Sequence, residues 1–173
     1  MKLIEFDGME FKVADEALLI RPIRELFQND KSKKKEDFWR QMSYLWFMCD
    51  PRSTYMYIVD EAERAKEIKL QEGFGEDWEP SMLLRDAMAI YRKHTITTAA
   101  ILLEGMRKGI DKLSAFLGET TFSEKTVASM TSALKQIPEL SKALVEAEKS
   151  LAKDFETDDK ARGNNVKAVG EDI

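Results

Sequence analysis

Apolar and polar residues alternate at the N-terminus, and this pattern predicts a β-hairpin. Asp7-Gly8 is a dipeptide favoured in type I′ turns and lies between the two alternating runs, so Phe6 is expected to pair with Met9. One face of the ribbon then carries its large apolar side chains, which are Ile4, Phe6, Met9, Phe11 and Val13. Because a lone two-stranded ribbon is only marginally stable in water, residues 1–13 are predicted to be a docking element.

From Ala14 onward the apolar positions recur at helical spacing, which predicts a helical domain over residues 14–156. The expected helices lie at about 22–28, 33–49, 60–71, 80–117 and beyond 121, with a β-prone run at 55–59 and a loop at 72–80. The segment 80–117 forms one long helix or two joined helices, and its weakest part is the β-branched cluster at 95–98. The sequence therefore predicts a mainly α fold, a helical bundle with long antiparallel helices, an N-terminal β-hairpin and an extended C-terminal tail.

The second predicted helix ends in a turn that is apolar on nearly every side. Between Met42 and Cys49, Ser43 is the only small polar residue, and Asp50-Pro51 then ends the helix. A helix that is apolar all round has to be buried all round. We therefore expect other parts of the chain to cover this turn on every side.

The two long helices carry apolar stripes. The expected stripes are Met82, Ala87, Ile90, Ala99, Leu102, Met106, Ile110, Leu113 and Leu117 on the first, and Val127, Met130, Leu134, Ile137, Leu140, Leu144, Ala147 and Leu151 on the second. Gly105 and Gly109 match a small-xxx-small spacing, which lets two soluble helices approach closely. Thr121 and Glu124 match a capping box for the second helix, in which Pro138 is expected to produce a kink.

The chain past Phe155 is polar and rich in charge. Residues 157–173 cannot bury enough apolar surface to become ordered in isolation. We therefore predict an extended tail over this range, which gains order by contact with a partner.

Composition narrows the class of protein. The chain has 173 residues and a net charge of -5, a length that fits a single domain. Cys49 is the only cysteine, which excludes an internal disulfide and fits a reducing compartment. The first residues lack the features of a signal peptide, and the apolar window at 95–103 is too short for a membrane span. We expect a soluble, intracellular chain without a membrane segment.

Groups that commonly perform catalysis are sparse in this sequence. His94 is the only histidine, so it cannot form a zinc site with Cys49 alone. Cys49 ends the most apolar turn of the chain, where burial raises the pKa of a thiol and makes it inert. Gly73-Phe74-Gly75 lacks the lysine and hydroxyl residue of a phosphate loop. Acidic pairs such as Glu76-Asp77 are usually just solvated. We predict that the protein is not an enzyme and uses no cofactor or metal.

Large aromatic side chains lie near the breaks between predicted elements. They are Trp39, Trp46, Tyr55, Tyr57, Phe74 and Trp78. Aromatic residues left at a surface typically anchor a partner, although burial in a core explains them equally well. The candidate partner-binding residues are these six, together with Phe6 and Phe11 of the hairpin and Arg162 and Val166 of the tail.

Lys31 to Lys35 contains four lysines in five residues. Such a cluster is able to touch phosphate groups, so the alternative function is that of a small helical regulatory or nucleic-acid-binding protein. A solvated helix start is the simpler explanation, because the net charge of the chain is acidic.

Three runs follow one another in the middle of the chain: Trp46-Phe47-Met48-Cys49-Asp50-Pro51-Arg52-Ser53, Tyr55-Met56-Tyr57 and Asp60-Glu61-Ala62-Glu63-Arg64. The tail adds Arg162-Gly163-Asn164-Asn165 and the final Gly170-Glu171-Asp172-Ile173. Over residues 40–72 and the tail, the chain resembles small virion proteins of tailed bacteriophages, notably the crAss-like group.

The resemblance implies a ring-forming connector or adaptor protein at the neck between portal and tail. Its partners would be copies of itself in a ring, the portal and other neck or tail proteins, with DNA possible in a channel and no membrane. The protein would be located in the virion after assembly in the host bacterial cytoplasm, and its function would be mechanical. A ring needs heterologous contacts, which unlike surfaces at the two ends of a chain can supply.

Removal of residues 157–173 tests the role of the predicted tail. The truncated protein is expected to keep its helical content, because the tail adds nothing to the helical core, and to lose assembly. Circular dichroism measures the first property and sedimentation of assembled particles measures the second. A truncated chain that still assembles normally contradicts this role.

Overall fold

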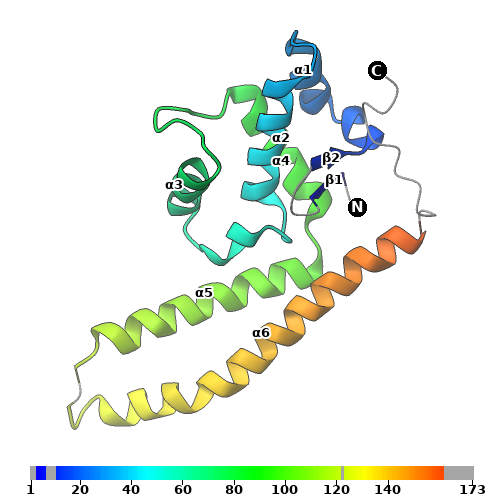
Figure 1. Ribbon diagram of the computed structural model, residues 1–173. Coiled ribbons are helices and arrows are strands. Elements are labelled where there is room, and N and C mark those ends of the chain that lie inside the picture. The colour runs from blue at the N-terminus through cyan, green and yellow to red at the C-terminus, as the bar shows by residue number, and fades with distance from the viewer. Residues whose placement is uncertain (1–2, 7–10, 122, 162–173) are drawn as a thin grey trace. The chain divides into compact units, whose positions relative to one another are not determined.

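The structure, a computed structural model, describes residues 3–6, 11–121 and 123–161 (Figure 1). In these ranges the chain is mainly helical with an N-terminal two-stranded hairpin, which confirms the predicted fold class. Two compact units are present: unit 1 comprises residues 1–96 and the chain from Phe155 onward, and unit 2 comprises residues 97–154. The expected helical domain over 14–156 is therefore not one unit.

The elements follow one another along the chain in a simple order. Unit 1 contains β1 (Ile4–Phe6), β2 (Phe11–Val13), a short 3₁₀ helix (Asp15–Leu19), α1 (Arg21–Asn29), α2 (Glu36–Cys49), a second 3₁₀ helix (Thr54–Tyr57), α3 (Glu61–Gln71) and α4 (Met82–Thr95). Unit 2 contains α5 (Thr98–Glu119) and most of α6 (Val127–Ala161).

The hairpin pairs in a different register from the predicted one. Ile4 pairs with Val13 and Phe6 with Phe11, so the predicted pairing of Phe6 with Met9 is wrong. The four residues after Phe6, where we expected a type I′ turn, lie outside the described residues. Side chains alternate along a strand with a period of two. A register difference of two positions therefore leaves the apolar side chains of both described strands on one face, as predicted.

The second half of α2 forms the centre of unit 1. Met42 and every residue from Tyr44 to Cys49 are buried. β2, the 3₁₀ helix Thr54–Tyr57, α3 and α4 all contact α2, while α1 packs against α4. The prediction that this apolar turn is covered on every side is confirmed.

The hairpin covers one side of α2 through a cluster of four rings. Phe6 and Phe11 stack with their centroids 4.3 Å apart. Each of them meets Trp46 and Phe47 edge-on, at centroid distances between 5.1 and 5.8 Å. Aromatic pairs in this geometry add stability beyond the area that they bury. The ribbon that needed a docking surface therefore finds one within its own chain.

α2 begins at Glu36, three residues after the predicted start at Lys33. Lys35 has a φ of 54°, in the left-handed region, and so cannot continue a helix on its N-terminal side. Asp30 fixes the new start, because its Oδ2 accepts the backbone N–H of Phe38 at 3.0 Å. That hydrogen bond is the largest of several effects that lower the pKa of Asp30. The lysine cluster therefore lies before the first turn of the helix, with Lys35 as the N-cap residue.

The last carbonyl groups of α2 are satisfied by side chains from the following segment. The Ser53 hydroxyl donates to the carbonyl of Phe47 at 2.8 Å. The guanidinium of Arg64, which is buried, donates from Nη1 to the carbonyl of Met48 at 3.2 Å and from Nε to that of Ile58 at 2.9 Å. A buried helix end leaves its final carbonyls without partners unless such donors are present.

The β-prone run predicted at 55–59 is wrong. Residues Thr54–Tyr57 form a 3₁₀ helix, and the Ser53 side chain caps it by accepting the N–H of Tyr55 at 3.2 Å. Local capping thus outweighs the β propensity of these residues. The following acidic helix is as expected, with Asp60 as its N-cap, and the predicted loop separates α3 from α4.

A buried carboxylate, Asp50, joins three parts of unit 1. Its Oδ1 accepts Arg52 Nε at 2.8 Å, and its Oδ2 accepts Arg52 Nη2 at 2.7 Å and the Tyr91 hydroxyl at 2.5 Å. Arg52 Nη2 also donates to the carbonyl of Ile4 at 2.8 Å, which ties the hairpin to the end of α2. Burial and the charge of Asp50 raise the pKa of Tyr91 well above its ordinary value, so its hydroxyl keeps the proton that it donates.

The long segment predicted over 80–117 forms two helices. α4 ends at Thr95 and α5 begins at Thr98, inside the β-branched cluster expected to be weakest. The Thr97 hydroxyl caps α5 by accepting the N–H of Ala100 at 3.1 Å. The side chain that favours a break also caps the helix that follows it.

α6 starts and ends later than predicted. The expected capping box at Thr121 and Glu124 is wrong, because Thr126 Oγ1 accepts the N–H of Ser123 at 3.0 Å and the helix begins at Val127. The helix then runs through Pro138 to Ala161 without a break. Residues 157–161 are therefore helical, and the rest of the predicted tail lies outside the described residues.

Tyr91→Phe tests the Asp50 network. The substitution leaves a buried carboxylate oxygen without one partner and is expected to destabilise unit 1 by about 2 kcal/mol. Urea unfolding followed by tryptophan fluorescence measures this, because all three tryptophans lie in unit 1. The matched control is Tyr57→Phe, whose hydroxyl belongs to an exposed residue and whose expected change is below about 0.5 kcal/mol. Equal effects would contradict the importance of the network.

Candidate interaction surface

The structure places most of the predicted partner-binding aromatics in or against the core of unit 1. Trp46 and Phe74 are buried, which agrees with the alternative that they belong to the core and not with a role as surface anchors. Five others are partly buried and pack against the same core: Phe6, Phe11, Trp39, Tyr55 and Trp78. Tyr57 is exposed, with 65% of its surface accessible. Arg162 and Val166 lie outside the described residues.

The buried aromatics cover one another around α2. Phe74 and Trp78, from the loop between α3 and α4, lie against Tyr44 with centroids 5.3 and 4.7 Å away. Tyr55 meets Phe47 edge-on at 5.2 Å. The all-round apolar pattern of α2 already required partners of this kind. The aromatics near element breaks are therefore explained by the fold and do not themselves indicate a partner.

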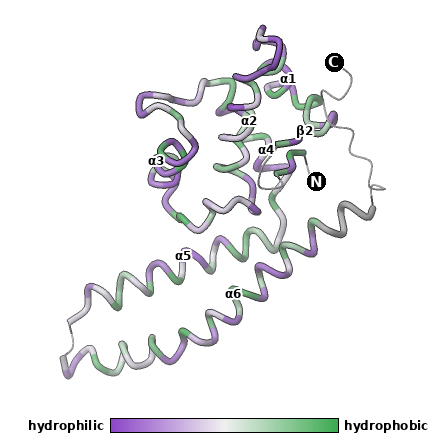
Figure 2. The backbone as a smooth tube through the Cα atoms, viewed as in Figure 1, coloured by the Kyte–Doolittle hydropathy of each residue, from purple (hydrophilic) through white to green (hydrophobic). Residues whose placement is uncertain are grey.

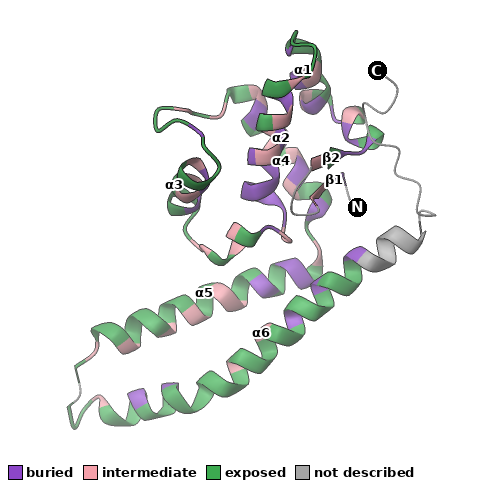
Figure 3. Cartoon of the chain, viewed as in Figure 1, coloured by how far each residue is buried: buried purple, intermediate pink, exposed green. Residues whose placement is uncertain are grey.

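Exposed large apolar side chains occur in both units: Leu19, Tyr57, Leu70, Met82 and Ile96 lie in unit 1, and a larger set lies in unit 2. Seven large apolar side chains on α5 and α6 have between 38% and 57% of their surface exposed, namely Ile101, Leu102, Phe116, Val127, Leu134, Ile137 and Val145. Figure 3 shows exposed positions along both helices, and Figure 2 shows that many positions there are hydrophobic. The sequence analysis predicted that several of these residues belong to buried stripes. Their exposure was missed because the hydrophobic periodicity does not reveal how many helices are available to cover a stripe.

Each of the two helices has buried side chains, and an ion pair links them. Leu103 on α5, and Met130, Ala133 and Ala147 on α6, are buried. The guanidinium of Arg107 lies 3.1 Å from the carboxylate of Glu148 and so links the two helices. Both partners of this ion pair are partly exposed, which limits the pair to less than about 1 kcal/mol.

The glycine spacing on α5 faces open space. Within the described residues, no atom outside the local helix lies within 4 Å of the position that a Cβ would take at Gly105 or Gly109. The predicted close packing of a second helix against these glycines is therefore wrong within this chain. The two glycines form part of the uncovered surface.

Potential metal ligands in the described part of the chain do not gather into a cluster. In those residues no three histidine, cysteine or acidic side chains are placed to hold a metal ion. No helix among them is long and apolar enough to cross a membrane. His94 is exposed at the end of α4. Cys49 is buried, and burial raises the pKa of its thiol to about 11.

The four lysines of the cluster differ in their hydrogen bonds. Lys31 donates to the carbonyl of Gln28 at 2.8 Å, and Lys35 donates to that of Asp30 at 2.5 Å. Lys33 and Lys34 are exposed. A hydrogen bond to one carbonyl leaves the positive charge of an ammonium group in place, so Lys31 and Lys35 still add to the attraction for a phosphate backbone.

Comparisons with protein-family models, with curated proteins and with solved structures find no match to this chain.

Thiol labelling tests the burial of Cys49. A pKa of about 11 against an ordinary 9.0 lowers the thiolate fraction at pH 8 about a hundredfold, and burial blocks access as well. The native chain is therefore expected to react with a disulfide reagent only as fast as it opens, and fully once it is unfolded in urea. Rapid stoichiometric labelling of the native chain would contradict this description of the core.

Proposed function

We propose that this chain is a structural connector of a tailed-phage particle, a ring-forming adaptor at the neck between portal and tail. It acts by protein–protein assembly, with copies of itself, the portal and other neck or tail proteins as partners. The phage assignment rests on the sequence resemblance around residues 46–64 and in the tail. The assembly role has independent physical support.

The observation that carries the assembly role is the uncovered apolar surface of α5 and α6. Soluble monomers rarely leave large contiguous apolar patches exposed, and such patches usually mark contact sites. Helices in proteins also gain most of their stability from packing an apolar face, more than from intrinsic propensity. Unit 2 has an ion pair between its two helices and exposed apolar side chains on both. A partner that covers them would stabilise the unit.

Unit 1 suits the role of a rigid body. Its core is built from a fully covered helix, and the buried side chains of Asp50 and Arg64 are hydrogen-bonded, whereas Nε1 of the buried Trp46 has no hydrogen-bond partner among the described residues. Such satisfied networks favour one well-defined structure. A body that keeps its shape can transmit force between neighbours, as a connector must.

Purified particles of a phage that encodes this chain test the proposal. The chain is expected to copurify with the particles through a density gradient, in a fixed ratio to the portal protein. Labelling with an antibody is expected to place it at the neck. A replication enzyme of the same phage is the matched control, because it is made during infection and should be removed by the gradient.

Absence of the chain from the particles would contradict the connector role. If the chain then also binds duplex DNA with steep salt dependence, and Lys33→Gln with Lys34→Gln removes that binding, the regulatory or nucleic-acid-binding alternative replaces it. The exposure of these two lysines is the observation that favours the alternative.

A further inference from the structure

We infer that the outer edge of β2 is a docking site for residues 165–169 of the same chain, in the tail beyond α6, which add to the hairpin as a third strand. Neither the edge nor its occupant depends on the connector function, so the inference goes beyond that function. It follows from the directions of the backbone groups in the hairpin and from the place where α6 ends.

The hydrogen bonds of the hairpin fix the direction in which each backbone group points. The N–H of Ala14 donates to the carbonyl of Leu3 at 2.9 Å, which makes these two residues a hydrogen-bonded pair. Such pairs alternate with non-hydrogen-bonded pairs along an antiparallel ladder. Ile4 and Val13 form the next pair, so their N–H and C=O groups point away from the partner strand, toward the two outer edges of the ribbon.

The outer edge of β1 is already in use. Arg52 Nη2 donates to the carbonyl of Ile4 at 2.8 Å, which agrees with the outward direction of that carbonyl. The same guanidinium is held by Asp50, so it stands where an added strand would have to pair. A third strand is therefore restricted to the other edge of the ribbon, on β2.

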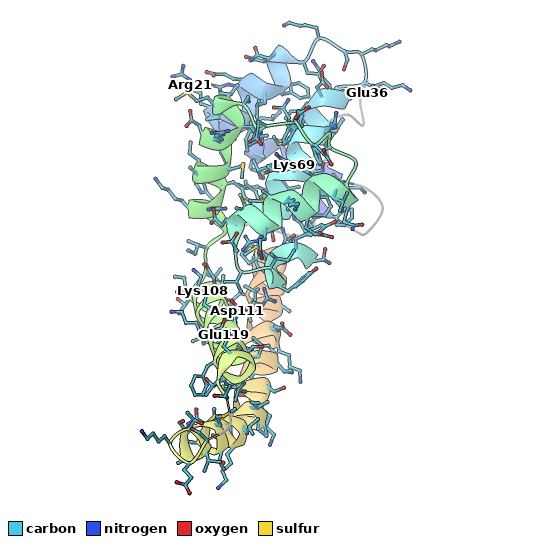
Figure 4. All side chains as sticks on the ribbon, turned by 90° about the vertical axis from the view of Figure 1, so that its left-hand side faces the viewer. Arg21, Glu36, Lys69, Lys108, Asp111 and Glu119 are labelled. Carbon is cyan, nitrogen blue, oxygen red and sulfur yellow. The ribbon has the colours of Figure 1, made fainter. Side chains whose placement is uncertain are left out.

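The outer edge of β2 holds buried backbone groups that need partners. Val13 has 0% of its surface exposed, so its outward N–H and C=O are shut off from water. Among the described residues neither group has a hydrogen-bond partner. The charged side chains that Figure 4 labels in unit 1 project from α1, α2 and α3, and none of them belongs to this edge. Because buried backbone groups are almost always paired, the edge of β2 requires a further donor and acceptor.

The tail contains one segment that suits this edge. Glycine aside, the apolar residues within 162–173 are Val166, Ala168, Val169 and Ile173. The first three lie together between Asn165 and Gly170, and a short apolar run bounded by asparagine and glycine is typical of a strand. Valine is also among the residues most enriched in strands. The segment 165–169 is therefore the part of the tail with the strongest tendency to form a strand.

The side-chain pattern of this segment matches that of β2. Phe11 and Val13 pack in or against the core, while Lys12 between them is exposed. Side chains of a strand alternate between its two faces, so the two apolar side chains of 166–168 share one face and Lys167 lies on the other. A strand added beside β2 thus places its apolar side chains toward the core and Lys167 in solvent.

α6 meets unit 1 close to the hairpin. The Phe155 ring lies 4.6 Å from the guanidinium carbon of Arg52. Arg52 in turn contacts the Ile4 carbonyl at 2.8 Å, and Ile4 lies opposite Val13 in the ladder. Since neighbouring strands lie about 4.8 Å apart, a strand beyond β2 is about 20 Å from the Phe155 ring.

The tail beyond α6 is long enough to reach this edge. α6 continues six residues past Phe155 and ends at Ala161, which adds up to about 9 Å. Val169 follows eight residues later, and eight extended residues span about 26–29 Å. The segment 165–169 therefore reaches the edge of β2 in its own chain, without help from a second copy.

Pairs of introduced cysteines test the added strand in the full chain. Lys12 belongs to a hydrogen-bonded pair with β1, so a residue facing it on an added strand is at a non-hydrogen-bonded site, with Cα atoms about 4.5 Å apart, a distance that a disulfide spans. Lys12→Cys is combined with one tail cysteine at a time, on the solvent face (Asn165→Cys, Lys167→Cys or Val169→Cys) or on the core face (Val166→Cys or Ala168→Cys). At least one solvent-face variant is expected to form an internal disulfide about tenfold faster than either core-face variant. Cys49 does not compete, because it is buried.

Hydrogen exchange of single amides, measured by NMR, tests the pairing of Val13 directly. The double variant Val166→Asp with Ala168→Asp puts charge on the core face of the added strand, and it is expected to speed exchange of the Val13 N–H about tenfold or more, because a buried hydrogen bond is lost. The Ala14 N–H is the internal control, since its acceptor, Leu3, lies within the hairpin. Lys167→Asp is the matched variant, because it changes charge on the solvent face, and it is expected to leave both exchange rates unchanged.

Three results would overturn the inference. They are equal rates of disulfide formation from the two faces, an unchanged exchange rate of the Val13 N–H in the double variant, and disulfides that join two chains in place of one. The third result would assign the edge to the tail of a second copy. Each leaves the connector function standing if the chain is found at the neck of particles, whereas absence from particles would remove that function and leave this contact measurable.

Discussion

The structure of unit 1 depends on one constraint, which is that the second half of α2 is apolar on every side. A helix of this kind has no face to give to water, so segments from both directions along the chain have to cover it. The hairpin supplies Phe6 and Phe11, and the loop between α3 and α4 supplies Phe74 and Trp78. Burial of so many large rings places most of the aromatic surface of the chain in one core.

Covering α2 in this way creates a second requirement, because its end is buried along with its side chains. Carbonyl groups at a helix end need donors, and a buried carboxylate needs partners. Arg64 and Ser53 satisfy the carbonyls, while Arg52 and Tyr91 satisfy Asp50. These polar contacts connect the hairpin, α2, α3 and α4. They therefore fix the arrangement of elements that apolar contacts alone would specify only loosely.

The sequence predicted the structure correctly where a residue pattern allows only one structural outcome. The all-round apolar turn of α2 had to be covered, and the β-branched cluster at 95–98 had to weaken a long helix. It was misleading where a hydrogen bond to one particular side chain decides the outcome. The start of α2 depends on a hydrogen bond from Phe38 to Asp30, eight residues away, and the run at 55–59 gave way to local capping by Ser53.

The exposure of the apolar side chains on α5 and α6 was not predicted for a related reason. The sequence reveals an apolar stripe along a helix, but it does not reveal how many neighbouring helices are available to bury that stripe.

The division of the chain has a consequence for the order in which the protein is synthesised. The chain leaves unit 1 after residue 96 and rejoins it at Phe155, whose ring lies 4.6 Å from the guanidinium carbon of Arg52. A ribosome has therefore made all of α5 and most of α6 before this contact can form. The nascent α2 core is able to close around Asp50 once Tyr91 has emerged, but the ring over Arg52 arrives last. Folding of unit 1 is thus coupled to translation through the late contact between Phe155 and Arg52.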